Sequence, residues 1–179
     1  MHKLNNNWTL WLHLPYDIDW SINSYKKVFT FDTLEDCISL IENINKEIVQ
    51  KCMLFIMKNN IKPIWEDSNN CKGGSLSYKI NTENVYDVWK KLNYYLIGGS
   101  LIDDKEVIDN INGISISPKK NFCIIKFWIK DTEILKNNEI FECLNSNDDE
   151  TIKIDPLNID ILCDIEKQHC LFKQHEILY

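Results

Sequence analysis

Hydrophobic positions along the chain follow two periods, one typical of strands and one typical of helices. Aromatic and β-branched runs predict strands at 8–14, 52–57, 75–80, 113–117 and 122–130. Helical spacing predicts one helix from its N-cap Thr33 to Ile48, and a second from about Asn84 to the glycine pair 98–99, with a left-handed cap. Because helices separate strand pairs that can be antiparallel, the pattern predicts an α+β fold, a sheet covered on one face by helices.

The periodicity weakens after residue 131. A short helix is predicted at 133–144, a loop at 145–150 and a strand at 151–162, while the last dozen residues fit either type of element. A length of 179 residues suits one domain with one hydrophobic core. We therefore expect a single domain over residues 1–179.

The charge of the chain narrows the class of partner. The net charge is −7, which argues against a general polyanion binder, because non-specific affinity for nucleic acid needs many cations. The chain contains no arginine and no alanine, a bias that indicates an AT-rich coding genome. Any phosphate contact must therefore come from lysine or from backbone N–H groups.

Cysteine and histidine usage argues against a disulfide scaffold, a metal site and histidine catalysis. The seven cysteines have no C-x-x-C spacing, and the four histidines have no catalytic spacing. No apolar stretch is long enough to span a bilayer, and the first residues have no leader-like apolar region. We expect a cytoplasmic protein without membrane contact, metal or other cofactor.

The loop "KPIWEDSNNCKGGS", residues 62–75, places an indole directly before two acids. Trp65 in this loop and Trp20 in "YDIDWSINS" are the two tryptophans expected outside strands and helices. Each is either a lid over the core edge or one plate of a sandwich around a planar, cationic ring. In the second case, Glu66 would accept hydrogen bonds from a ring edge with two donors, such as that of guanine. The glycine pair 73–74 would let the chain turn into the next strand.

Lysines cluster near the hairpin turn at 118–121. Lys119 and Lys120 lie in the turn, and Lys126 shares a strand face with Trp128 by the period of two. These lysines form either a solvated basic turn or a phosphate site beside the ring pocket.

Several of these stretches together resemble one known family. "WTLWLHL", Trp20, "FDTLEDC", "IKPIWEDSNNCKGGS", "VWKKLNYYLIG" and "IIKFW" occur in the order found in the eukaryotic translation initiation factor 4E family, which binds the 7-methylguanosine cap of mRNA. The resemblance covers about residues 2–128, and the part at 133–179 is divergent. It implies a curved antiparallel sheet with helices on its convex face and a cap-binding cleft on its concave face.

The resemblance also assigns roles to single residues. It implies that Trp20 and Trp65 stack on the methylated base, that Glu66 binds its Watson–Crick edge and that Trp128 contacts the N7-methyl group. Lys119, Lys120 and Lys126 loosely match the residues that bind the cap phosphates. The chain departs from the family at Ser75, where an arginine is usual. Trp8 and Trp11 would be structural.

A partner-binding surface is implied on the helical side. Its residues are Leu4, Leu34, Ile38, Lys90, Lys91 and Tyr94. Ile38 stands where the family has a tryptophan, and Lys91 where it has a glutamate. We therefore expect a cognate, divergent scaffold protein of the factor 4G type that carries a complementary acid.

The leading hypothesis is non-enzymatic binding of capped mRNA in translation initiation. The alternatives are a repressor that sequesters the cap, a cap-hydrolysing enzyme and a carbohydrate-binding module with aromatic platforms. The composition and divergence fit a protist or a large DNA virus as the source, and the second source would place the protein in the host cytoplasm.

Overall fold

The computed structural model describes residues 1–136, 151–152, 156–166 and 170–175, and in this part eight strands form one antiparallel sheet. Their order across the sheet is β2-β1-β3-β5-β6-β4-β8-β7. The strands are β1 (Lys3–His13), β2 (Lys26–Thr33), β3 (Met53–Lys58), β4 (Gly74–Asn81), β5 (Ile111–Pro118), β6 (Phe122–Ile129), β7 (Thr151–Ile152) and β8 (Cys170–Gln174). The helices are η1 (Ile22–Ser24), α1 (Leu34–Asn43), α2 (Lys46–Lys51), α3 (Val85–Gly98), α4 (Lys105–Asp109), α5 (Thr132–Lys136) and α6 (Ile159–Cys163).

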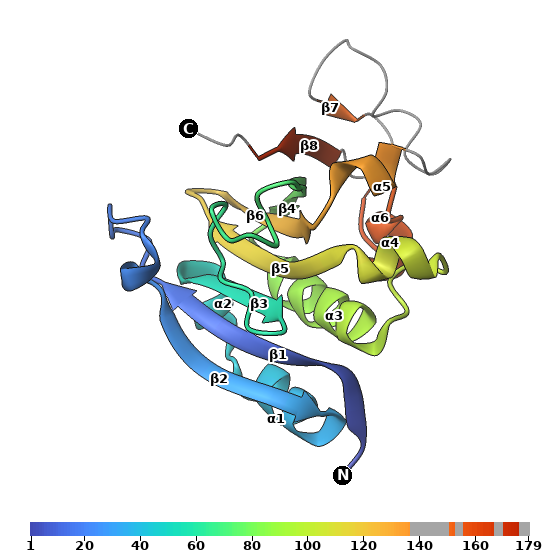
Figure 1. The fold of residues 1–179 in the computed structure, drawn as a ribbon. Helices are drawn as coiled ribbons and strands as arrows, with labels where there is room; N and C mark the ends of the chain where they lie inside the picture. The colour runs from blue at the N-terminus through green and yellow to red at the C-terminus, as the bar shows by residue number, and fades with distance from the viewer. Residues whose placement is uncertain (137–150, 153–155, 167–169, 176–179) are drawn as a thin grey trace.

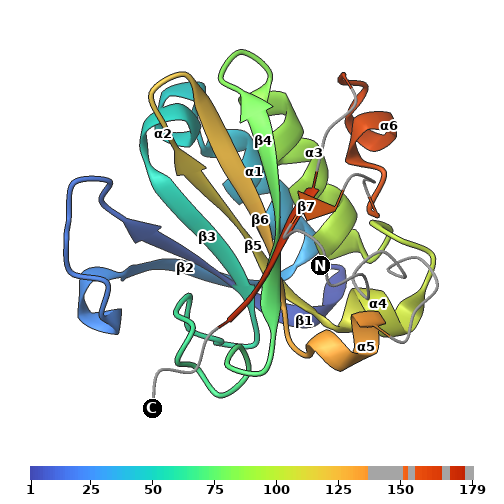
Figure 2. The same cartoon turned by 90° about the horizontal axis from the view of Figure 1, so that it is seen from above.

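The sheet is curved, and α1, α2 and α3 lie on one side of it (Figures 1 and 2). The helix α1 packs against β2, whereas α2 and α3 pack against each other and against β5. We call the helix-covered side the back face and the opposite side the front face. The predicted α+β class and the helix-covered sheet are confirmed.

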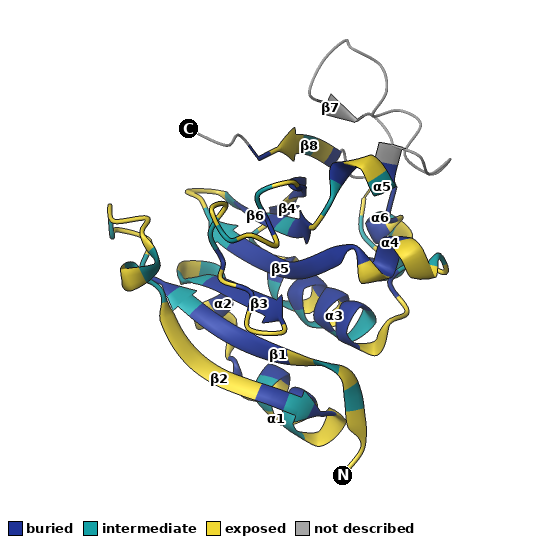
Figure 3. Cartoon of the chain, viewed as in Figure 1, coloured by how far each residue is buried: buried dark blue, intermediate teal, exposed yellow. Residues whose placement is uncertain are grey.

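The back face carries the main hydrophobic core. Strand residues alternate between the two faces, and those on the back face meet the apolar stripes of the helices. Fully buried members of this core are Trp8, Ile56, Leu76, Tyr78, Ile114, Ile125, Phe127, Val88, Trp89, Leu92 and Leu96. Burial along β1, β3, β5 and α3 is visible in Figure 3.

The front face carries a second, smaller apolar cluster. Its buried members are Trp11, Phe55, Met57, Ile61 and Trp128. The strand register explains this set, because Trp11 of β1 lies opposite Phe55 of β3, which lies opposite Ser115 of β5. Residues directly opposite each other on neighbouring strands share a face. The front face therefore has an apolar floor of its own, on the side of the sheet opposite α1, α2 and α3.

Both predicted helix caps are confirmed. The Thr33 hydroxyl accepts from the Asp36 N–H at 3.2 Å and starts α1. Gly99 follows α3 with φ at 73°, the left-handed conformation that glycine adopts most readily.

The predicted single helix from Thr33 to Ile48 is wrong, because the chain forms α1 and α2 instead. Asn45 is the reason, since its side chain accepts from the Ile48 N–H at 2.9 Å and caps a new helix. The strand β2 was not predicted at all. It is an edge strand, exposed over most of its length, so its apolar residues show no core pattern.

The prediction of a strand at 151–162 is wrong for its second half. Ile159 and Cys163 are buried one helical turn apart in α6, whereas β7 accounts only for residues 151–152. The predicted helix at 133–144 begins as α5, and its remainder and the predicted loop at 145–150 fall outside the described residues.

The glycine pair 73–74 serves close packing and not a turn. Neither glycine has a positive φ. A Cβ atom on Gly73 would lie 1.7 Å from the carbonyl oxygen of Ile129, and one on Gly74 would lie 2.6 Å from that of Lys173. Because these contacts are with neighbouring backbone, the pair lets β4 approach both β6 and β8.

Candidate functional site

Two of the six tryptophans are half-exposed, and both lie in loops, as predicted. Trp20 follows β1 and is 55% exposed, and Trp65 lies between β3 and β4 and is 39% exposed. The other four, at positions 8, 11, 89 and 128, are buried. Exposed indole surface beside an apolar floor is a feature of binding sites.

A buried histidine stacks on each exposed tryptophan. The rings of His13 and Trp20 lie 4.5 Å apart at 7°, and those of His175 and Trp65 lie 5.3 Å apart at 15°. One face of each indole is therefore covered by an imidazole. His13 is held in turn by a hydrogen bond between its Nε2 and the carbonyl oxygen of Asp19, at 2.9 Å.

The sequence prediction missed both histidines. His13 shares the alternation of Trp11 along β1, so the period of two already placed it on the front face. His175 comes directly after β8, in a part of the chain whose periodicity was ambiguous, and no local signal could have found it.

Ring contacts connect the two exposed tryptophans in an unbroken series across the front face. From Trp20 the series runs through His13, Tyr25, Phe55, Trp128 and His175 to Trp65. The centroid distances of successive pairs lie between 4.5 and 6.3 Å, the range of favourable aromatic pairs. The connections after β1 and after β3 lie on the same side of the sheet (Figures 1 and 2). The structure thus places three predicted residues, Trp20, Trp65 and Trp128, along one series of ring contacts on the front face.

His175 is neutral near pH 7 and its tautomer is defined by its contacts. Burial lowers its pKa most, and the charge of Lys126 lowers it further, against the opposite effects of the Asn70 carbonyl and Glu66. Its Nδ1 lies 2.8 Å from the carbonyl oxygen of Asn70, which can only accept, so Nδ1 carries the proton. Its Nε2 is then an acceptor, buried without a hydrogen-bond partner among the described residues.

Glu66 lies beside this aromatic series with its carboxylate uncommitted. Burial raises the pKa of Tyr25 to about 12, and the charge of Glu66 adds to that shift. The same charge acts on His175. In the described part of the chain, no donor bonds to the Glu66 carboxylate, whereas its neighbour Asp67 accepts from the backbone N–H groups of Lys62 and Asn69. Asp67 is thus a loop-organising residue, and Glu66 remains available to a ligand.

Trp128 forms part of the floor and not a second wall. It is buried, packs edge-on against Phe55 and donates from Nε1 to the Ser115 hydroxyl at 3.0 Å. Ser115 lies on the same face of the neighbouring strand. This bond fixes the plane of the indole.

The predicted lysines are only partly brought together. Lys126 is half-buried, and its pKa is lowered by burial and then by the charges of Lys119 and Lys173. Lys119 is exposed in the β5–β6 turn, where its N–H donates to the carbonyl oxygen of Phe122. Lys120 is exposed, and among described residues it has no recorded contact with the site. Lys173, which the sequence prediction missed, has its Nζ 5.8 Å from the centre of the Trp65 ring.

The predicted partner surface is on the back side of the molecule. Leu34 and Ile38 project from α1 with 42% and 44% of their surface exposed. Leu4 of β1 is half-buried and packs on the main core. Two exposed aliphatic residues on one helix turn are consistent with a docking surface.

The polar members of that surface are already paired within the chain. Glu42 of α1 accepts from Lys90 at 2.5 Å and from the Tyr94 hydroxyl at 2.7 Å. These two bonds lower the pKa of Glu42. Lys91 donates to the carbonyl oxygen of Cys163 at 3.2 Å. Lys90 therefore has an internal acid, whereas Lys91 bonds only to a backbone carbonyl oxygen, so the partner acid expected from Lys91 stays a prediction.

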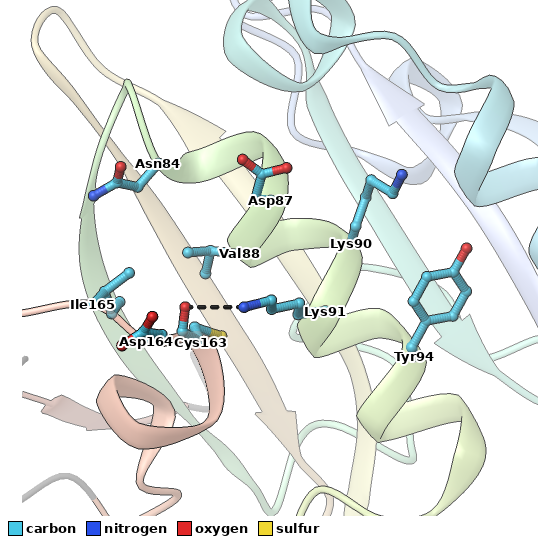
Figure 4. Close-up of a pocket in the computed structure, with 9 residues that line it drawn as sticks. All are labelled: Asn84, Asp87, Val88, Lys90, Lys91, Tyr94, Cys163, Asp164 and Ile165. Carbon is cyan, nitrogen blue, oxygen red and sulfur yellow. Dashed lines mark hydrogen bonds between the residues drawn. The ribbon is translucent and has the colours of Figure 1, made fainter.

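A pocket of about 470 Å³ opens between α3 and α6 (Figure 4). Its lining residues are Asn84, Asp87, Val88, Lys90, Lys91, Tyr94, Cys163, Asp164 and Ile165. It thus contains Lys90, Lys91 and Tyr94 of the predicted partner surface. It lies on the helical side and shares no lining residue with the aromatic series.

Within the described ranges, no group of three or more His, Cys, Asp or Glu side chains could hold a metal ion. No disulfide is seen between the six cysteines in those ranges. None of the helices seen there is long and apolar enough to cross a membrane.

Comparison with known proteins identifies similar chains. The family model described as eukaryotic initiation factor 4E matches residues 3–176, which extends well past the stretch where motifs were evident in the sequence. The chain is 32% identical to the translation initiation factor 4E of Eremothecium gossypii over 136 residues, which is 72% of this chain and 63% of that protein.

Two further relatives broaden the comparison. An initiation factor 4E homologue of Acanthamoeba polyphaga mimivirus is 28% identical over 136 residues, 64% of this chain and half of that protein. The solved complex of Caenorhabditis elegans eIF4E-3 with the 4E-binding protein Mextli and a cap analogue has a TM-score of 0.76 at 22% identity. The structural match covers 97% of this chain and 92% of the C. elegans chain. This last similarity is one of fold.

Proposed function

Because the chain belongs to the eukaryotic initiation factor 4E family, we propose that its front face binds the 7-methylguanosine cap of mRNA. The single observation that carries the proposal is the series of ring contacts that ends in two half-exposed, histidine-backed tryptophans. The proposal treats residues 1–179 as one cap-binding unit that brings mRNA to translation initiation. The C. elegans relative is complexed with a cap analogue, which supports the same class of ligand here.

In this proposal Trp20 and Trp65 stack on the methylated base. Stacking contributes about 1–3 kcal/mol per aromatic ring. Methylation at N7 gives the base a positive charge, which gains a further ~0.5–2 kcal/mol from the electron-rich indole faces. The neutral imidazole of His175 supports Trp65 without adding a charge that would repel such a base.

Glu66 would read the edge of the base. A carboxylate only accepts hydrogen bonds, and the N1–H and exocyclic amine of guanine present two donors. The uncommitted carboxylate beside Trp65 supports this role. Trp128, in the floor, would meet the N7-methyl group, since its indole plane is fixed by Ser115.

The phosphates would extend toward the β5–β6 turn. Lys119, Lys120 and Lys126 are the proposed cations, of which Lys126 is the most confined. A cation whose pKa is lowered by other cations gains from an anion placed between them. Cap affinity should therefore fall with salt.

The back face would bind a scaffold protein of the factor 4G type. The exposed Leu34 and Ile38 support an apolar contact, with Leu4 beside the core and Lys90, Lys91 and Tyr94 at the pocket. The C. elegans relative is complexed with a 4E-binding protein. Ile38, which stands where the family has a tryptophan, favours a partner that does not rely on contact with that indole.

The second candidate is a repressor that binds the cap without recruiting a scaffold. The polar pairing of Glu42 with Lys90 and Tyr94 on the docking side favours it. A pull-down with cap-bound protein distinguishes the two candidates. Recovery of a scaffold by wild type and its loss in Ile38→Asp supports recruitment, whereas recovery of no scaffold supports sequestration.

Tryptophan fluorescence titration tests cap binding. We expect 7-methyl-GTP to bind about 2- to 30-fold more tightly than GTP, because the charge of the ring adds the cation–π contribution of ~0.5–2 kcal/mol. Glu66→Gln should weaken binding strongly, since the amide replaces a charge-assisted acceptor. Glu83→Gln, an exposed carboxylate beyond β4, is the matched control and should bind as wild type does. Equal affinity of wild type for both nucleotides would remove the base sandwich.

A further inference from the structure

The front face holds lysines from three different elements without an acid to pair with them. Lys119 lies in the β5–β6 turn, Lys126 in β6 and Lys173 in β8. No ion pair involves any of the three in the part of the chain that is described. By contrast, Lys3, Lys51 and Lys90 each pair with a carboxylate. Three unpaired cations repel one another, and an anion between them would relieve that repulsion.

The register of the sheet places Lys126 and Lys173 on either side of a strip of small residues. On β4, Ser77 lies opposite Lys126 of β6, and Ser75 lies opposite both Trp128 of β6 and Lys173 of β8. Opposite residues share a face, so all of these side chains belong to the front face. The β4 side chains between the two lysines are therefore two short serines.

The strip also offers hydrogen-bond donors. The hydroxyls of Ser75 and Ser77 make no recorded hydrogen bond to the described residues, although both residues are buried. A hydroxyl can donate to a phosphate oxygen, and hydrogen bonds to charged groups are stronger than neutral ones.

The position of Lys173 connects this strip to the ring site. Its Nζ lies 5.8 Å from the centre of the Trp65 ring. The charge of Lys173 also lowers the pKa of Lys126, as the charge of Lys119 does. Lys173 is thus near the exposed tryptophan and electrostatically coupled to the other two cations.

We propose that Lys173, together with Lys126 and Lys119, forms an anion site over Ser75 and Ser77 that takes the phosphate chain of the ligand bound at Trp65. Lys173 supplies from β8 the cation that β4 lacks at Ser75. The inference rests on the proposed function, since the phosphate chain is that of the capped nucleotide. It deepens that function by assigning a phosphate-binding role to the last described strand.

A phosphate series with one charge variant tests the assignment. The probes are 7-methylguanosine and its mono-, di- and triphosphate, titrated into wild type and Lys173→Gln. We expect the nucleoside to bind both proteins equally and the triphosphate to bind the variant about 5- to 20-fold more weakly. The slope of log affinity against log salt should become less negative by about 1, as for the loss of one phosphate contact.

Two further variants separate the charge from other effects. Lys173→Arg keeps the charge and should retain most of the triphosphate affinity. Lys46→Gln removes an exposed lysine from α2 on the back face, so it changes the net charge equally and should leave affinity and salt slope unchanged.

The outcomes are distinguishable. If Lys173→Gln binds the triphosphate with wild-type affinity and salt slope while methyl selectivity persists, the role of Lys173 is overturned and cap binding stands. An equal loss for the nucleoside and the triphosphate also overturns it, because Lys173 would then act on the ring site alone. If wild type shows no methyl selectivity, cap binding fails and this assignment fails with it.

Discussion

The two faces of the sheet are built from the same strands but differ in what covers them. The back face is closed by α1, α2 and α3 and buries a large apolar core. The front face has a five-residue apolar cluster, two half-exposed tryptophans and several unpaired charges. The front face therefore contributes less buried apolar surface to stability than the back face does. Its rings are positioned by histidines and by one another, which prepares them to contact a ligand.

Truncating one tryptophan on each face should give the largest difference between the two faces. Trp89→Ala removes a fully buried back-face indole and should lower the free energy of unfolding by about 3–5 kcal/mol. Trp65→Ala should lower it by less than about 1 kcal/mol, because the ring is exposed. The same Trp65 variant should weaken 7-methyl-GTP binding about 10- to 100-fold through lost stacking. Urea denaturation and fluorescence titration measure the two quantities. A Trp65 variant as unstable as the Trp89 variant would contradict the distinction.

Lys58 tests the cost of a charge on the back face. It is 6% exposed, its Nζ lies 5.7 Å from the centre of the Trp8 ring, and it donates to the carbonyl oxygen of Ile108. Burial lowers its pKa to about 8. Below pH 8 both folded and unfolded states carry the proton, and the full burial cost is present. Between pH 8 and about 10.5 only the unfolded state keeps it, so this residue makes stability rise with pH.

Lys58→Met should therefore stabilise the protein at pH 7 by about 1–2 kcal/mol, the burial cost less the lost hydrogen bond. The gain over wild type should shrink as the pH rises from 8 to 10.5. Urea denaturation at several pH values measures both effects, and Lys26→Met, at an exposed position of the edge strand β2, is the control. A variant less stable than wild type at pH 7 would show that the hydrogen bond outweighs the burial cost.

The smallest expected effect is the contribution of His175, on the front face, to the pH dependence of stability. Its pKa is lowered by burial and by Lys126, so the unfolded state takes up a proton at a higher pH than the folded state. Stability should fall as the pH decreases below about 6.5. In His175→Phe this part of the pH dependence should disappear, and in Lys126→Gln it should weaken. Denaturation midpoints measured from pH 7 to 5 check this. If the midpoint of His175→Phe falls with pH as steeply as that of wild type, another group causes the pH dependence.

Local patterns predicted most of the fold because strand and helix periods are local. The strands of the core, the Thr33 cap and the Gly99 cap follow from neighbouring residues alone. The break at Asn45 was missed because the apolar spacing continues across it, while a single side-chain cap decides the structure. The edge strand β2 was missed because an exposed strand lacks a buried period.

The candidate site was predictable where residue type and loop position suffice. Trp20 and Trp65 stand out as large rings in polar loops, and Trp128 follows from its strand. His175 and Lys173 depend on the pairing of β8 with β4, which lies about a hundred residues earlier in the chain. The Glu42–Lys90 pair likewise depends on the packing of α1 beside α3. Such contacts arise from tertiary register, which no local pattern contains.

The most direct test of the front-face site observes all six tryptophans at once. Selective labelling of the indole nitrogens gives one NMR signal for each ring, three of which belong to the proposed base site. On saturation with 7-methyl-GTP, we expect the signals of Trp20 and Trp65 to move most and that of Trp128 to follow. The back-face signals of Trp8 and Trp89 should stay in place. Movement of Trp8 or Trp89 with Trp20 and Trp65 unchanged would contradict the account.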